Sequence, residues 1–268
     1  MYVFSKQEIR EFLNRGESFA KQSLGQNYLV SRQGMLAICS KLQDGGEIIE
    51  IGAGMGNITI NYFQNYTKVT LIEKDTTSIA ILRENLTKFN NDIYPEWVSI
   101  IEADVMDIDI TTYIDPSIPY QIIGALPYNI GKMIVRQTLS LIPAPQQCTF
   151  ILQREVADKY MAKPPDANIL STTAELFATI KRHEILPGHD FYPVPKVDSR
   201  IITIQNFKHY DKESIAEASK ESAFIKQCYN NPRKKLRNTL PFSVPEDLGN
   251  KRPQELSTLE WKNLFLSK

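Results

Sequence analysis

A tetrapeptide, Ala125-Leu126-Pro127-Tyr128, follows a predicted strand over residues 120–124 and has the residue types needed to hold an amine-bearing ring. Pro127 stiffens the turn and has no N–H to donate. The backbone carbonyl of Leu126 is left free to accept from an amine, and Tyr128 offers a flat face on which a base can stack. The tetrapeptide therefore predicts a site that presents the exocyclic amine of a base, although Ala125 supplies no side-chain acceptor.

A glycine-rich turn, Glu50 to Gly56, follows another predicted strand and precedes a predicted helix. Its glycines at positions 52, 54 and 56 allow a sharp turn and a close approach of backbone to ligand. The spacing is GxGxG, whereas dinucleotide-binding turns favour GxGxxG. The carboxylate of Glu50 is a poor neighbour for a pyrophosphate but suits a ligand with amino or hydroxyl groups.

Two further acids end the next two predicted strands, Glu73 after residues 68–72 and Asp104 after residues 98–102. The carboxylate of Glu73 is expected to accept from both ribose hydroxyls of a nucleoside, and that of Asp104 from an adenine amine. Either acid alone is more simply a solvated strand-end carboxylate. Together with Glu50 and the glycine turn, they predict an S-adenosylmethionine pocket.

A second proline-containing stretch runs from Phe191 to Ser199. Pro193 and Pro195 predict a rigid, extended loop. Phe191 and Tyr128 would sandwich one flipped base, each stacked face contributing ~1–3 kcal/mol. An alternative explains the stretch equally well: Phe191 is a core aromatic, and the two prolines belong to an ordinary surface turn.

Strands and helices alternate along the first two hundred residues, which predicts an α/β fold with a parallel, doubly wound, Rossmann-like sheet. After about residue 185 the strands are expected to form an antiparallel hairpin at one edge. Beyond residue 206 the chain is predicted to be helical over 212–240 and 253–267. We therefore predict a Rossmann-like domain over 1–206 and a small helical domain over 207–268. The predicted strands of the first domain cover 47–51, 68–72, 98–102, 120–124, 148–153 and 201–205, and its helices 5–15, 31–42, 57–64, 76–89, 131–141, 155–161 and 170–181.

Composition excludes several other classes of protein. The formal net charge over 268 residues is zero, so there is no global field for polyanions. Cys39, Cys148 and Cys228 are too far apart in sequence for a zinc motif, which predicts buried thiols in a reducing compartment and no metal site. The absence of a signal-like N-terminus and of long apolar runs predicts a cytoplasmic protein without a membrane segment.

Basic residues cluster near the C-terminus, and no acid separates them: Lys226, Arg233, Lys234, Lys235 and Arg237. Such a run is often only a solvated helix face. Together with Lys6, Arg10, Arg15 and Lys21 near the N-terminus, it would form a two-sided cradle for the phosphates of structured RNA.

The order of these motifs resembles the dimethyladenosine transferases that act on small-subunit ribosomal RNA, relatives of the macrolide-resistance rRNA methyltransferases. The resemblance runs nearly end to end. It covers residues 21–29, the glycine turn, the tetrapeptide, Gln153 to Ala157, the loop from Phe191 and the basic segment. It implies that the following residues border the cofactor: Gln26, Asn27, Leu29, Glu50, Gly52, Gly54, Gly56, Glu73, Asp104 and Val105.

The resemblance implies that Ala125, Leu126, Pro127, Tyr128 and Phe191 form the catalytic slot. The implied reaction transfers methyl groups from S-adenosylmethionine to adenosine N6 in small-subunit rRNA, within an immature subunit, by a monomeric enzyme. Ala125 stands where the family has an asparagine that accepts from this amine. Three explanations are open: an engineered inactive variant of an active enzyme, a natural member that serves as a ribosome-assembly factor without catalysis, or a water or neighbouring group that supplies the acceptor. The intact cofactor and stacking positions favour the first. A DNA adenine methyltransferase is a poorer match, because its tetrapeptide usually has two prolines.

Overall fold

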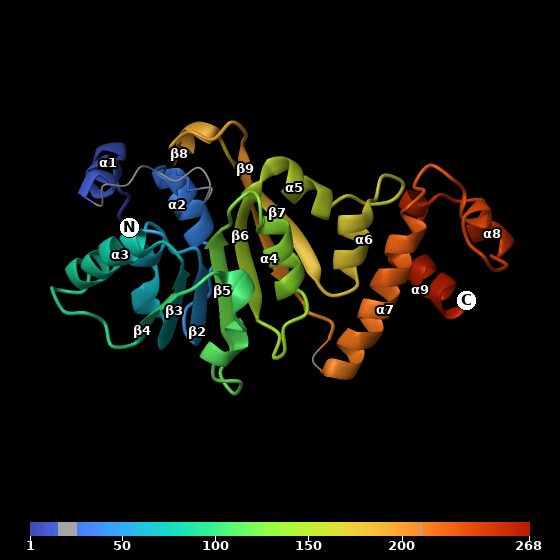
Figure 1. Cartoon of the computed structure of the whole chain (residues 1–268), viewed down its shortest axis with the longest axis horizontal. Helices are drawn as coiled ribbons and strands as arrows, with labels where there is room; N and C mark the ends of the chain where they lie inside the picture. The colour runs from blue at the N-terminus through green and yellow to red at the C-terminus, as the bar shows by residue number, and fades with distance from the viewer. Residues whose placement is uncertain (16–25, 210) are drawn as a thin grey trace.

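A seven-stranded sheet forms the centre of the computed structural model, which describes residues 1–15, 26–209 and 211–268 (Figure 1). The strand order is β4-β3-β2-β5-β6-β9-β7. The predicted α/β, Rossmann-like class is confirmed. The strands are β2 Glu47–Ile51, β3 Lys68–Glu73, β4 Val98–Glu102, β5 Tyr120–Ala125, β6 Gln147–Gln153, β7 Thr179–Leu186 and β9 Ser199–Gln205, and a separate antiparallel pair joins β1 Tyr28–Leu29 to β8 Phe191–Tyr192.

Strands β4, β3, β2, β5 and β6 are parallel, and β9 and β7 add an antiparallel edge. Every residue of β2 is buried, as expected for a parallel strand that is covered on both faces. The predicted edge hairpin is present, but it starts at Thr179, earlier than expected. The helix predicted over 170–181 therefore ends at Glu175. Pairing of Thr179 with Gln205 on β9 overrides the local helical pattern.

The helices flank this sheet, and the two chain termini lie at opposite ends of the molecule (Figure 1). The helix predicted over 57–64 is wrong: two 3₁₀ turns, Thr59–Asn61 and Phe63–Asn65, replace it. The β-branched residues at 58–60 are poor helix formers. The helices are α1 Lys6–Arg15, α2 Arg32–Cys39, α3 Thr76–Lys88, α4 Gly131–Thr138, α5 Arg154–Tyr160, α6 Ile169–Glu175, α7 Lys212–Cys228, α8 Glu246–Gly249 and α9 Thr258–Leu266.

The C-terminal helices pack beside the sheet, with α7 between it and α8 and α9 (Figure 1). Ile225 and Trp261 are fully buried and belong to the same hydrophobic cluster as Ile122 and Phe150 of the sheet. The long helix predicted over 212–240 ends at Cys228, and the basic segment beyond it contains turns and one short 3₁₀ segment. Within the described residues, no helix is long and apolar enough to cross a membrane.

Candidate cofactor and acceptor site

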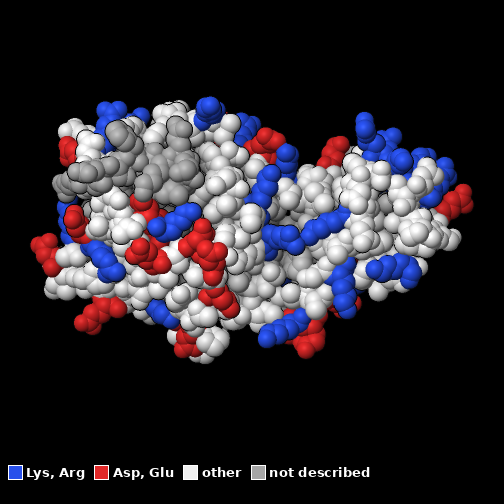
Figure 2. All heavy atoms as spheres, in the orientation of Figure 1, with Lys and Arg blue, Asp and Glu red and all other residues white. Residues whose placement is uncertain are grey.

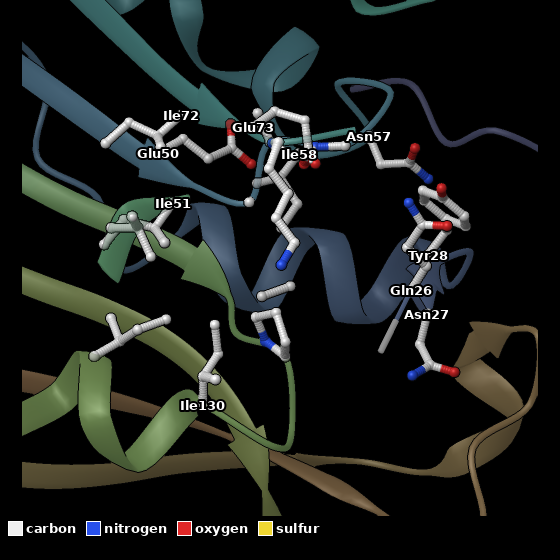
Figure 3. A pocket seen from close by; sticks show the side chains of 18 of the residues that line it. Gln26, Asn27, Tyr28, Glu50, Ile51, Asn57, Ile58, Ile72, Glu73 and Ile130 are labelled. Carbon is white, nitrogen blue, oxygen red and sulfur yellow. Dashed lines mark hydrogen bonds between the residues drawn. The ribbon is translucent and has the colours of Figure 1, made fainter. Parts of the chain in front are cut away.

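A cleft with an empty volume of about 860 Å³ opens at the carboxyl ends of β2, β3, β4 and β5. This edge of a parallel sheet is where ligands bind in doubly wound folds. Glu50 and Glu73 lie on one side of the opening, with Ile130 across from them (Figure 3). The lining includes nine of the ten predicted cofactor residues: Gln26, Asn27, Leu29, Glu50, Gly52, Gly54, Glu73, Asp104 and Val105.

The glycine turn adopts backbone conformations that favour glycine. Gly52, Gly54 and Gly56 have φ values of +73°, +54° and +86°. A Cβ on Gly54 would lie 3.3 Å from Cε1 of Tyr28, and one on Gly56 only 2.8 Å from Cδ1 of Leu82. Gly56 does not line the cleft. Its contact with Leu82 indicates that it lets α3 pack closely against the turn.

Glu50 is almost fully buried at the base of the cleft. One carboxylate oxygen accepts from the hydroxyls of Thr59, at 2.5 Å, and Tyr62, at 2.6 Å. Burial raises the pKa of Glu50 to about 7, and nearby Glu73 adds to the rise. The 3₁₀ turns at 59–65 thus have a direct consequence for the site, because they bring both hydroxyls to this carboxylate.

Glu73 joins the glycine turn to the residues that directly follow β3. It accepts from the N–H groups of Gly54 at 2.8 Å, and of Lys74 and Asp75 at 2.9 Å each. A carboxylate has about four acceptor positions, so this arrangement leaves capacity for a ligand hydroxyl. Burial raises the pKa of Glu73 despite these bonds.

Asp104 stands at the tip of β4. Its carboxylate accepts from the N–H of Met106 at 2.9 Å and pairs with the ammonium of Lys74 at 3.2 Å. The bond from Met106 and the pairing with Lys74 lower its pKa. Asp104 is therefore a charged acceptor at the rim of the cleft, while Glu50 lies at its base.

The side chain of Asn57 indicates that the cleft suits a ligand with hydrogen-bond donors. Its Nδ2 donates to the carbonyl of Leu29 at 3.3 Å, whereas its buried Oδ1 has no partner among the described residues. A buried amide oxygen without a donor is costly. This orphan acceptor, the carboxylates and the glycine cradle fit S-adenosylmethionine, which brings amine and hydroxyl donors.

The tetrapeptide forms one wall of the cleft through Ala125 and Pro127. Leu126 N–H donates to the carbonyl of Ile151 on β6 at 3.1 Å. Within the described residues, the carbonyl of Leu126 accepts no hydrogen bond. Its availability matches the predicted acceptor. Tyr128 is half-buried, just outside the cleft lining, and its hydroxyl lies 2.8 Å from Oγ of Ser199.

Phe191 does not offer the expected stacking face. Its side chain is only 2 % exposed and belongs to a core cluster with Leu29, Ile151 and Ile201. Pairing of β8 with β1 sets Phe191 opposite Leu29, and alternation along the strand turns it inward. The alternative explanation, a core aromatic, is correct for this structure.

Several lining residues were not predicted from the sequence: Tyr28, Asn57, Lys74, Ile130 and Ile134. Tyr28 and Asn57 adjoin predicted motifs and could have been found by extending them. Ile130 and Ile134 are four residues apart at the start of α4, a spacing that puts both on one helix face. Residues 21–25 of the predicted N-terminal motif, including Lys21, lie outside the described residues.

The basic residues occupy two places. Arg233, Lys234, Lys235 and Arg237 are exposed in the turns between α7 and α8, where Lys and Arg atoms gather at the upper right of Figure 2. Lys226 instead lines a groove between α4, α6 and α7, with Lys132 and Arg136. Partial burial lowers the pKa of Lys226, and Arg136 lowers it further.

At the other end of the chain, Arg10 donates to the hydroxyl of Tyr192 at 2.9 Å, and its guanidinium lies over that ring. Among the described residues, no group of three His, Cys, Asp or Glu side chains is arranged to hold a metal ion.

The sheet, the glycine turn and the acids at three strand ends define a Rossmann-like, S-adenosylmethionine-dependent methyltransferase. The family model for ribosomal RNA adenine dimethylase matches residues 18–254. The chain therefore belongs to this family, and it is an rRNA adenine dimethyltransferase that uses S-adenosylmethionine. The resemblance noted in the sequence is confirmed.

Relatives named ribosomal RNA small subunit methyltransferase A include one from Mesoplasma florum, 32 % identical, covering 82 % of this chain and 83 % of its own. One from Sulfurihydrogenibium is 28 % identical, and the match covers 91 % of this chain and 95 % of the relative. A dimethyladenosine transferase from Plasmodium falciparum shares the fold, with a TM-score of 0.74, 19 % identity and coverage of 90 % and 96 %. The 23S rRNA methyltransferase ErmE has a TM-score of 0.70, 21 % identity and coverage of 89 % and 98 %.

The raised pKa of Glu50 predicts a pH-dependent stability of the ligand-free protein. The folded pKa of about 7 lies above the ordinary value of 4.5, so the contribution of Glu50 is fully present at low pH and is lost as the pH rises through 7. Relative to Glu50→Gln, the parent should lose about 2–3 kcal/mol of unfolding free energy between pH 5 and pH 8. Urea unfolding at both pH values measures this difference. The exposed Glu102→Gln is the matched control, and parallel pH curves for parent and Glu50→Gln would contradict the prediction.

The core position of Phe191 predicts that its replacement affects stability rather than RNA binding. Phe191→Ala should lower the free energy of unfolding by about 3–5 kcal/mol, while Phe191→Leu should lose much less because it keeps apolar volume. Denaturant unfolding and filter binding to small-subunit rRNA measure the two properties. If Phe191→Leu folds stably but binds RNA tenfold more weakly, Phe191 stacks on a base after all.

Proposed function

We propose that this chain transfers methyl groups from S-adenosylmethionine to N6 of adenosines in small-subunit rRNA, with a rate reduced by Ala125. The observation that carries this proposal is the position of Ala125 and Pro127, on the wall of the cleft that also contains Glu50, Glu73 and Asp104. The names of the relatives supply the subunit.

In this proposal different residues of the cleft bind different parts of the cofactor. Glu73, at the tip of β3, accepts from the ribose hydroxyls, and Asp104 with Val105 borders the adenine. Gln26, Asn27 and Leu29 close the cleft from the opposite segment, and Gly52 and Gly54 let the backbone approach. The orphan Oδ1 of Asn57 and the spare acceptor capacity of Glu73 support this assignment.

S-adenosylmethionine, when bound, supplies an electrophilic methyl group. The protein must then hold an adenine amine whose lone pair is delocalised into the ring. The free carbonyl of Leu126 accepts one N–H, which directs the lone pair toward the cleft. Stacking on Tyr128 alone, without Phe191, fixes the ring plane and favours the cationic transition state. Positioning and charge complementarity therefore account for most of the catalysis.

Ala125 removes the second acceptor for the amine. A hydrogen bond that strengthens in the transition state contributes ~2.7–4 kcal/mol, or ~10²–10³ in rate. The methyl side chain of Ala125 is partly exposed at the end of β5, and a methyl group cannot accept a hydrogen bond from the amine.

RNA is held, in this proposal, by Arg233, Lys234, Lys235 and Arg237 on the turns after α7 and by Lys226 in the groove beside α4. Cations bind phosphates without reading sequence. Selectivity then comes from RNA shape, in an immature small subunit in the cytoplasm. We assign residues 1–206 to the methyltransferase domain and 207–268 to an RNA-binding domain of a monomer.

A second candidate function is a ribosome-assembly or transcription factor that binds RNA without catalysis. Ala125 is the observation that favours it, since this substitution affects the amine acceptor and spares the cleft. Calorimetric titration with S-adenosylmethionine, followed by tritiated methyl incorporation into immature subunits, separates the two functions. Cofactor binding without any incorporation supports either a disabled enzyme or the second candidate.

Restoring the missing acceptor should restore rate. Ala125→Asn is expected to raise methyl transfer into immature small subunits by at least about tenfold, because the amine gains a transition-state hydrogen bond. Cofactor affinity should change little. Ala125→Leu, which fills the same space without an acceptor, is the control. Equal turnover by the parent and Ala125→Asn would show that position 125 does not accept from the amine.

Charge reversal should test the basic turns. The double variant Lys234→Glu with Lys235→Glu is expected to weaken RNA binding and to lower the slope of log affinity against log salt by about 2, one phosphate contact per lysine. Lys212→Glu with Lys220→Glu, both exposed on α7, is the control of equal charge change. An unchanged salt slope would remove the turns from the RNA interface.

A further inference from the structure

The two proline-containing segments meet through one side-chain hydrogen bond. The hydroxyl of Tyr128 lies 2.8 Å from Oγ of Ser199, across 71 residues of sequence. Tyr128 is half-buried and directly follows Pro127, which lines the cleft. Burial raises the pKa of its phenol, which therefore stays protonated near neutral pH and can donate to Ser199.

Ser199 is a fixed point of the fold. It is fully buried at the first residue of β9, which lies between β6 and β7 inside the sheet. It pairs with Gln153 on one side and with Leu186 on the other. Because β9 is antiparallel to β6, its first residue lies at the carboxyl edge of the parallel strands, where the cleft opens.

The residue before Ser199 is fixed as well. The carbonyl of Asp198 accepts from the N–H of Arg154 at 2.9 Å, and its carboxylate accepts from the N–H of Gly188 at 3.2 Å. The guanidinium of Arg154 lies 3.6 Å from the same carboxylate. The Oγ of Ser199 therefore has a position set by three strands and the proline loop, independent of the tetrapeptide that it contacts.

We propose that Ser199 is a positioning residue that holds the ring of Tyr128 at the angle needed for stacking on the target base. Tyr128 lies on a turn after the end of β5, where the strand ladder no longer constrains it. Apart from Ser199, no hydrogen bond to its hydroxyl is found among the described residues. This role rests on the proposed function, because it concerns the base that the tetrapeptide receives.

Two substitutions remove this hydrogen bond from opposite sides. Ser199→Ala removes Oγ, and Tyr128→Phe keeps the stacking ring but removes the hydroxyl. Both are made in the Ala125→Asn chain, and methyl incorporation into immature small subunits is measured. Each should lower kcat by about tenfold, as expected for a misplaced reactant, with KM for the subunit changed less than twofold. The double variant should be no slower than either single variant. Ser199→Thr, which restores a hydroxyl, should recover most of the rate.

Thr203→Val is the matched control for the loss of a buried hydroxyl on the same strand. Thr203 is buried, and its hydroxyl bonds to His183, 2.9 Å away, rather than to the tetrapeptide. Thermal unfolding of all variants separates loss of fold from loss of positioning. The inference is overturned if Thr203→Val lowers kcat as much as Ser199→Ala at equal stability, or if the two single effects multiply in the double variant. Failure of the proposed function is distinct, since the Ala125→Asn chain itself would then transfer no methyl groups.

Discussion

The site depends on the hydrogen bond from the N–H of Gly54 to the carboxylate of Glu73. It ties the glycine turn after β2 to the tip of β3, and the N–H of Gly52 adds a bond to the carbonyl of Ile72 at 2.8 Å. The left-handed backbone at positions 52 and 54 is what allows both contacts. These hydrogen bonds hold the glycine turn at the carboxyl edge of the sheet, where the turn lines the cleft.

The hydrogen bond from Gly54 also fixes the Glu73 carboxylate in the poorly solvated interior of the cleft, near the carboxylate of Glu50. Glu73 and Glu50 are both buried, which raises the pKa of each carboxyl, and the charge of Glu73 raises the pKa of Glu50 further. A cationic ligand offsets this rise, because an opposite charge nearby favours the carboxylate form. Asp104 behaves differently, since Lys74 already pairs with it. The carboxylates of Glu50 and Glu73 can therefore accept a cationic group, whereas the charge of Asp104 at the rim is already balanced by Lys74. This difference suits a ligand that has its positive groups at one end.

Much of this site could be predicted from the sequence, because its signals are local. The acid that precedes the glycine turn and the acids that end β3 and β4 are fixed by strand periodicity and parallel order. The sequence left both a stacking and a core position open for Phe191, because its direction depends on the pairing of β8 with β1, more than 160 positions away in the chain. Asn57 adjoins the glycine turn and could have been found by extending that motif, but its unpaired oxygen could not be predicted, because it depends on where Leu29 lies. Long-range pairing decided both cases, and residue spacing carries no information on it.

The consequence of Ala125 follows from how the backbone around it is held. Ala125 pairs with Ile151 in the β5–β6 ladder, and Leu126 continues that attachment through its N–H. Neither contact uses the side chain at position 125. The direction of the Leu126 carbonyl is therefore set by the sheet, and so is the start of the turn that leads to Tyr128. Alanine at this position removes a chemical group and leaves the scaffold in place, which is why the acceptor and the cofactor cleft can be altered separately in this fold.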